Sequence, residues 1–276
     1  MSQELPRVDV GVFGGSGFYD LLEGAAQYEL TTPFGALSDK VTIGDIGGKT
    51  VAFIPRHGSG HSLAPHEINY RANVWAMREL GATRILGPSA SGSLQPDVEP
   101  GDFVIVDQFA DRTWGRCDTF FTGDAPDLPF FAGRGVTHIS SADPYCPELR
   151  ALAIAGCEKL GIKHHKDGTV VVIQGPRFST RAESKWFSGL GWKVINMTQY
   201  PEAYLARELE ICYTNIALIT DYDAGVDATE AVSNKEVLQV FAENLDKLKS
   251  LLYEIIPNIP AERHCLCKDA LGAAEM

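Results

Sequence analysis

Short apolar runs rich in β-branched residues alternate with amphipathic stretches along most of this 276-residue chain. Strands that alternate with helices predict an α/β fold, here a central mixed sheet with a largely parallel core flanked by helices. We expect one domain over residues 8–256, because α/β folds of this length are often undivided. Residues 257–276 show no periodicity and are expected to form a mobile tail. The expected strands cover residues 8–13, 49–54, 84–87, 103–107, 168–174, 193–198 and 216–219, and the expected helices 65–80, 147–160, 180–190, 201–209 and 234–256.

The charge balance limits the partners of the chain. A net charge of −12 argues against a nucleic-acid or anionic-membrane surface, although a local positive pocket can still hold an anionic substrate. No apolar run approaches the roughly 18 residues of a membrane span, and residues 1–7 lack a signal-peptide core, so we expect a cytosolic protein. Six cysteines are too sparse for a disulfide scaffold.

The end of the expected strand 216–219 carries two carboxylates, Asp221 and Asp223. If the extended backbone continues, both point to one side of the chain, at the sheet edge where α/β proteins bind ligands. Two close carboxylates ionise together only at a high cost, so we expect one to hold a proton near neutral pH. Such a donor–acceptor pair fits adenine, whose N7 accepts and whose 6-amino group donates. A solvated turn is the competing interpretation.

Other strand ends carry groups suited to an anion. Ser16 lies in a glycine-rich turn, whose backbone N–H groups can approach an anion, although the turn lacks the dinucleotide-binding spacing. Arg56 and His57 follow the strand 49–54, and arginine is the natural bidentate partner of phosphate. Ser89 and Ala90 lie in a second hydroxyl-rich strand end, and Thr198 in a third. For the glycine-rich turn, the alternative is a tight turn at the strand end; for Arg56 and His57, it is a surface arginine with a satisfied histidine.

Two further cysteine- or histidine-containing segments are expected to bind no metal. His57, His61 and His66 lie close in sequence, but no cysteine or carboxylate spacing accompanies them. Cys265 and Cys267 lie in the expected tail, where we interpret the thiols as inert, with a metal or redox role as the alternative. Residues 112–135 form a long aromatic segment without a period, which is typical of a functional loop or an interface.

Hydroxyls, one arginine and one histidine suit inorganic phosphate, and two carboxylates suit an aminopurine, so the combination predicts phosphorolysis of a purine nucleoside. The sequence also resembles the 5′-methylthioadenosine phosphorylases of the trimeric purine nucleoside phosphorylase family, from about Val10 to Ile256. The motifs that carry the resemblance are Gly14-Gly15-Ser16-Gly17, Pro55-Arg56-His57-Gly58, Gly175-Pro176-Arg177-Phe178-Ser179, Asn196-Met197-Thr198 and Thr220-Asp221-Tyr222-Asp223.

This resemblance implies a role for each matched residue. Met197 would pack under the ribose and Phe178 beside the base. Asp221, protonated, would donate to N7 as the glycosidic bond breaks, and Asp223 would bind the 6-amino group. No metal or organic cofactor is implied, and phosphate is a co-substrate. The implied phosphate ligands are Ser16, Arg56, His57, Ser89, the backbone at Ala90, and Thr198.

The resemblance also bears on specificity and assembly. Ser179 and Asp221 stand where the 6-oxopurine branch has Glu and Asn. This difference favours nucleosides of adenine over inosine and guanosine. Val237 fits an apolar pocket for the 5′ substituent, whereas Asn234 stands where the family often has valine. His138 resembles a residue that reaches this pocket from a neighbouring subunit, which implies a homotrimer.

Two other functions stay open. An adenosine or broad 5′-modified-adenosine phosphorylase would follow if Asn234 admits polar 5′ groups. The alternative that is not an enzyme is a catalytically silent nucleoside-binding protein. The complete set of Arg56, His57 and Asp221 argues against it.

Overall fold

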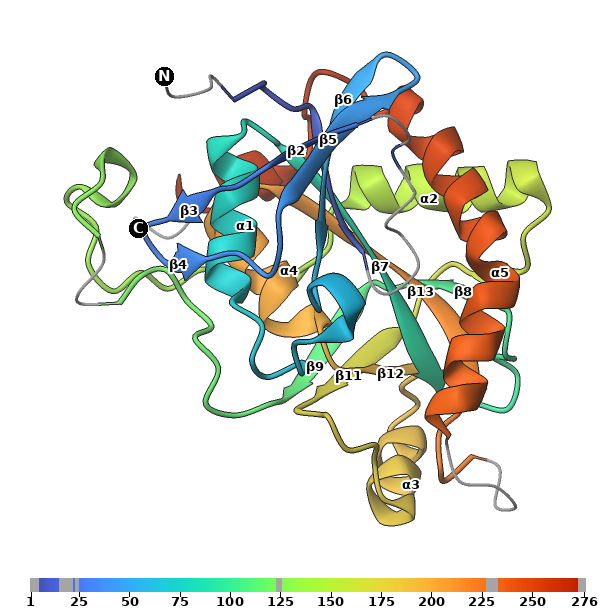
Figure 1. Cartoon of the computed structure of the whole chain (residues 1–276). Helices are drawn as coiled ribbons and strands as arrows, with labels where there is room; N and C mark the ends of the chain where they lie inside the picture. The colour runs from blue at the N-terminus through green and yellow to red at the C-terminus, as the bar shows by residue number, and fades with distance from the viewer. Residues whose placement is uncertain (1–4, 15–21, 23–24, 123–125, 227–232, 273–276) are drawn as a thin grey trace.

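A computed structural model of the chain describes residues 5–14, 22, 25–122, 126–226 and 233–272, with only the backbone of Asn234 and Glu236 (Figure 1). Its helices are α1 (Tyr70–Glu79), α2 (Pro147–Leu160), α3 (Arg181–Gly189), α4 (Gln199–Glu208) and α5 (Asn234–Ile255), with 3-10 turns η1 (Ser59–His61), η2 (Pro129–Phe131), η3 (Ile256–Asn258) and η4 (Leu266–Asp269). In the described part of the chain no helix is long and apolar enough to cross a membrane.

Among the described residues, one mixed sheet of eleven strands forms the centre of the molecule, and β3 and β4 pair separately. The central strands β6, β1, β7 and β13 lie parallel to one another, whereas β5, β12 and β8 pair antiparallel with β6, β7 and β13. The sequence-based prediction of a mixed sheet with a parallel core is therefore confirmed. The strands are β1 (Val10–Gly14), β2 (Ala26–Tyr28), β3 (Thr31–Thr32), β4 (Gly35–Ala36), β5 (Val41–Ile46), β6 (Lys49–Pro55), β7 (Arg84–Ser93), β8 (Phe103–Ile105), β9 (Gln108–Arg112), β10 (His164–His165), β11 (Thr169–Ile173), β12 (Val194–Asn196) and β13 (Cys212–Tyr222).

Helices cover both faces of the sheet, which explains why the central strands β1 and β13 are buried along nearly their whole length. In β13, Ile216 and Leu218 pack into a cluster that includes α2 and α5. Ala217 and Ile219 point to the other face and join a cluster that includes α1 and α4. Successive side chains of a strand thus fill two separate cores.

Several element bounds differ from the sequence-based predictions. The strand expected at 84–87 runs on to Ser93 as β7, because its small residues continue the parallel register with β13. Helix α1 begins at Tyr70 rather than Pro65, since Asn69 caps it by accepting a hydrogen bond from the Ala72 N–H at 3.2 Å. An unexpected strand, β9, precedes the aromatic segment and ends at its first residue, Arg112. Helix α2 has the predicted bounds.

Residues 257–272, expected as a tail, lie against the core. Ile259, Cys265, Cys267 and Leu271 are all buried there. A domain boundary near residue 257 and the mobility of the segment beyond it stay predictions.

Candidate active site

The carboxyl end of β13 carries the first acidic residue. Asp221 lies within β13, next to a register shift between Ile219 and Asp221, and not beyond the strand as we expected. Its side chain accepts a hydrogen bond from Thr220 Oγ1 at 2.7 Å and is 7% exposed. On the neighbouring strand, a Cβ added at Gly92 would lie 3.1 Å from Asp221 Oδ2. The glycine therefore leaves room for this carboxylate.

The second acidic residue is fixed by a residue from another element. Asp223 follows β13, and its N–H donates to the Ser93 carbonyl at 2.9 Å. Ser179 Oγ, between β11 and α3, lies 2.5 Å from both carboxylate oxygens of Asp223. Ser179 and Asp223 are both buried, whereas the adjacent Phe178 is 37% exposed. The arrangement holds an acceptor carboxylate beside an accessible aromatic ring.

Arg56 directly follows β6 and is 1% exposed. Its Nε and Nη2 donate to the two carboxylate oxygens of Glu202 at 2.7 and 2.8 Å, and its Nη1 donates to the Pro88 carbonyl at 2.9 Å. Burial disfavours the charged guanidinium, but Glu202 more than offsets this and raises the pKa of Arg56 above its ordinary value. The buried arginine is therefore always charged. Sequence reasoning missed Glu202, because it lies 146 positions from Arg56 and no local pattern links the two.

A chain of contacts brings Arg56 together with two predicted hydroxyl residues. Ser89 follows Pro88 on β7 and accepts hydrogen bonds from Asn215 Nδ2 at 3.0 Å and Asn196 Nδ2 at 3.4 Å. Two residues after Asn196, the buried Thr198 is the N-cap residue of α4, the helix that carries Glu202. Arginine and hydroxyl groups thus converge near a helix N-terminus, which is an environment suited to an anion.

Ala90 lies beside Ser89 on β7 and is exposed. The structure therefore leaves this position of β7 accessible next to the convergent hydroxyl groups.

His57 is neutral in this environment. Burial lowers its pKa to about 4. Its Nδ1 lies 2.9 Å from the Leu63 carbonyl, which can only accept, so Nδ1 carries the proton and Nε2 does not. The resemblance implied that His57 binds phosphate; in this arrangement it presents an acceptor at Nε2, and its ring stacks on His61.

Met197 connects the two groups of residues. It is half-buried at the end of β12, and a Cβ added at Gly175 would lie 2.6 Å from its Sδ. Gly175 also has a positive φ of 64°, so glycine is required there on both counts. Met197 therefore packs against the segment that leads to Phe178 and Ser179.

The remaining predicted residues are placed less closely. Val237 is half-buried on α5, and His138 is exposed in irregular chain before α2. Ser16 and the side chain of Asn234 lie outside the described residues. A hollow of about 450 Å³ near Gly175 is lined by Trp114, Arg177 and Trp186 among others, and Asp221 and Asp223 are not part of it. The convergence of side chains, rather than this hollow, marks the site.

The chain matches known proteins over nearly its whole length. Residues 9–257 match the family model described as the phosphorylase superfamily. A purine nucleoside phosphorylase of Streptomyces coelicolor is 48% identical, over 98% of this chain and 96% of that protein. An S-methyl-5'-thioadenosine phosphorylase of Thermofilum pendens is 49% identical, over 98% of this chain and 99% of that protein.

A solved structure agrees with these relatives. Methylthioadenosine phosphorylase from Schistosoma mansoni, in complex with adenine, superposes with a TM-score of 0.89 at 37% identity, over 97% of this chain and 99% of that one. The family that the motifs indicated is thus confirmed by sequence and by fold: this chain belongs to the phosphorylase superfamily.

Proposed function

We propose that this enzyme cleaves the N-glycosidic bond of 5′-methylthioadenosine with inorganic phosphate, giving adenine and 5-methylthioribose 1-phosphate. The observation that carries the proposal is the Asp221, Asp223 and Ser179 group, set beside the Arg56, Ser89 and Thr198 group. The first group suits a 6-aminopurine and the second suits phosphate. Relatives named for methylthioadenosine support the same substrate.

The chemistry follows from where charge develops. As the C1′–N9 bond breaks, its electron pair moves onto the purine and C1′ becomes oxocarbenium-like. Asp221, protonated, donates to N7 and neutralises the leaving adenine. Phosphate stabilises the cationic sugar and then forms the new bond from one of its oxygens to C1′. These steps use side chains and phosphate alone, so we infer no metal or organic cofactor in the reaction.

The phosphate ligands in this proposal are Ser16, Arg56, His57, Ser89, the backbone at Ala90, and Thr198. The pKa of His57 and its bond to Leu63 support a particular role. Neutral His57 accepts, through Nε2, a hydrogen bond from a phosphate that retains one proton, while Arg56 supplies the positive charge. Glu202 holds the Arg56 guanidinium in place and does not touch phosphate.

The base and sugar take the remaining positions. Phe178 packs beside the purine, and Met197 lies under the ribose. Asp223 accepts a hydrogen bond from the 6-amino group, and Ser179 orients the Asp223 carboxylate. Val237 and Asn234 line the 5′ pocket, and His138 reaches it from a neighbouring subunit. Exposed apolar side chains in the same part of the chain support that assembly, since Trp114 is 65% and Val136 69% exposed. We infer a homotrimer that acts in cytosolic purine and methionine salvage.

A broader adenosine phosphorylase is the second candidate, because the Streptomyces relative is named a purine nucleoside phosphorylase. The test is adenine release from methylthioadenosine and from adenosine, with and without phosphate, with inosine as a 6-oxopurine control. Phosphate-dependent release with a strong preference for methylthioadenosine supports the first candidate. Equal turnover of both adenine nucleosides favours the second, and no product with either identifies a silent binding protein.

A further inference from the structure

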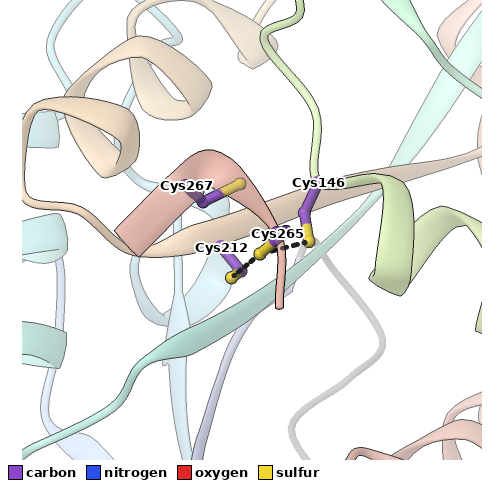
Figure 2. A group of neighbouring side chains, drawn as sticks. All are labelled: Cys146, Cys212, Cys265 and Cys267. Atoms are coloured by element: carbon purple, nitrogen blue, oxygen red, sulfur yellow. Dashed lines mark hydrogen bonds between the residues drawn. The ribbon is translucent and has the colours of Figure 1, made fainter. Parts of the chain in front are cut away.

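Four of the six cysteines meet in one buried cluster (Figure 2). Cys146 precedes α2, Cys212 begins β13, and Cys265 and Cys267 belong to the C-terminal segment. Asp221 lies nine residues further along β13, which corresponds to about 30 Å of extended strand. The cluster therefore has no contact with the reacting groups.

The sulfur atoms have the spacing of ligands around one ion. All four lie within 4.8 Å of one another. Cys265 Sγ is 3.3 Å from Cys212 Sγ and 3.7 Å from Cys146 Sγ. Tetrahedral zinc with bonds of about 2.3 Å to sulfur places its ligands about 3.8 Å apart, whereas a disulfide requires about 2.05 Å. An iron–sulfur cluster lies between its thiolates and needs a wider cavity than one ion does.

The donor set selects the metal. Four thiolates with no histidine or carboxylate favour a soft or borderline ion, and a closed Cys₄ site is typical of structural zinc. The Cys-x-Cys spacing is one residue shorter than the usual range. The backbone accommodates it, because Cys265 is extended, with φ −77° and ψ 158°, and Cys267 lies in the following turn η4.

The surroundings favour negative charge on these sulfurs. Cys146 is the N-cap residue of the 14-residue helix α2, whose positive dipole end stabilises a thiolate. Arg84 is the register partner of Cys212 on β7 and is 2% exposed.

Arg84 also links the cluster to the C-terminal segment. Its Nη2 donates to the carbonyls of Pro260 and Glu262, at 3.2 and 3.0 Å, and its Nε is buried without a hydrogen-bond partner. A zinc ion with four thiolates carries a net charge of −2, and a buried cation on the adjacent strand partly compensates it.

We propose that Cys146, Cys212, Cys265 and Cys267 bind one zinc ion in a closed structural site. The ion ties the C-terminal segment to the start of β13 and to α2. It leaves no coordination position open for substrate, so its role is stability and not catalysis.

The first experiment measures metal in the full-length, untagged protein, purified without chelator from zinc-supplemented cells. Elemental analysis should give about one zinc per chain, released when an organomercurial titrates the four thiols. Two outcomes overturn the proposal: a metal-free protein in which all six thiols react after denaturation, or a mass, measured without reductant, that is lower by two hydrogens per disulfide bridge. Copper or iron in place of zinc also overturns it.

The second experiment compares Cys265→Ala/Cys267→Ala with Cys157→Ala, which removes a buried thiol of α2 outside the cluster. The double variant should lose its zinc and melt at a lower temperature, yet release adenine at the wild-type rate at 25 °C. The control should keep its zinc. Retention of zinc by the double variant would contradict the site. If that variant does not fold, the zinc content of the wild-type protein and the release of its zinc by the organomercurial still test the site.

Discussion

Glu202 and Arg56 form a two-point hydrogen-bonded ion pair with oxygen–nitrogen distances of 2.7 and 2.8 Å, and both side chains are at most 2% exposed. The pair connects α4 to the end of β6. Tyr213 Oη, on β13, donates to the same carboxylate at 2.5 Å. Nε, Nη1 and Nη2 of Arg56 each donate a hydrogen bond to Glu202 or to the Pro88 carbonyl. An arginine fixed in this way can present its remaining N–H groups in one direction, which is what recognition of phosphate requires.

Glu202→Gln should therefore impair both folding stability and phosphate binding. The change leaves a charged guanidinium unpaired in the interior, and we expect a loss of about 3–5 kcal/mol in the free energy of unfolding. The KM for phosphate should rise at least about tenfold, which equals ~1.4 kcal/mol. Urea unfolding at fixed protein concentration and phosphate-dependent kinetics measure the two effects.

The matched control for that substitution is Glu158→Gln. It breaks an exposed ion pair in which Lys166 Nζ lies 2.6 Å from Glu158 Oε1. Solvent screens this pair, so we expect little change in the free energy of unfolding and unchanged phosphate kinetics. Equal losses in the two variants would show that burial of the Arg56 pair has no special importance.

Ser179→Ala should weaken nucleoside binding. It removes the hydroxyl that lies 2.5 Å from both Asp223 oxygens, and a hydrogen bond to a charged group contributes about 1.5–3 kcal/mol. We expect the KM for methylthioadenosine to rise by about tenfold or more, with a smaller change in kcat. Ser179→Thr keeps the hydroxyl and should restore much of the affinity; an alanine variant with a wild-type KM would exclude this role for Ser179.

Asp221→Asn should slow the chemical step. The amide can still donate a hydrogen bond to N7 but cannot transfer a proton, and general acid catalysis typically contributes about 10²–10⁴-fold. Single-turnover adenine release at saturating methylthioadenosine and phosphate isolates this step. Asp223→Asn is the companion variant, with its larger effect expected on KM. Full activity of Asp221→Asn would mean that another group protonates the base.

The low pKa of His57 predicts a pH-dependent stability. The folded protein holds this imidazole neutral down to about pH 4, whereas the unfolded chain binds the proton near pH 6.5. The unfolded state thus carries more protons between these values, so stability is lost as the pH falls through that window. At pH 4 and below, this effect lowers the free energy of unfolding by about 3 kcal/mol relative to pH 7, because each unit of pKa difference corresponds to ~1.36 kcal/mol.

His57→Asn serves to isolate that contribution. Glu208 is buried and has a pKa raised to about 7, so its protonation stabilises the folded protein as the pH falls. The pH dependence of the wild-type stability therefore combines two opposite effects and does not isolate His57. The difference between the unfolding free energies of wild type and variant, measured in phosphate-free buffer from pH 7 to 4, should shrink as the pH falls. Parallel curves would show that His57 titrates normally in the folded protein.

Local sequence patterns were sufficient for much of this protein. The apolar period of residues 147–160 predicted the bounds of α2, and the alternation of strands and helices predicted the parallel core. The same motifs that indicated the family predicted Asp221, Asp223 and Arg56 as site residues, and these roles stay predictions. Such features follow from the sequence because each depends on neighbours within one helix turn or strand.

Tertiary structure alone decided what these residues contact. Glu202 lies 146 positions from Arg56, and Ser179 lies 44 positions from Asp223. The cysteines that we interpreted as inert tail residues meet two others across 119 and 53 positions. No local period records such pairs, because the sheet register and the helix packing bring distant segments together only after both cores have formed.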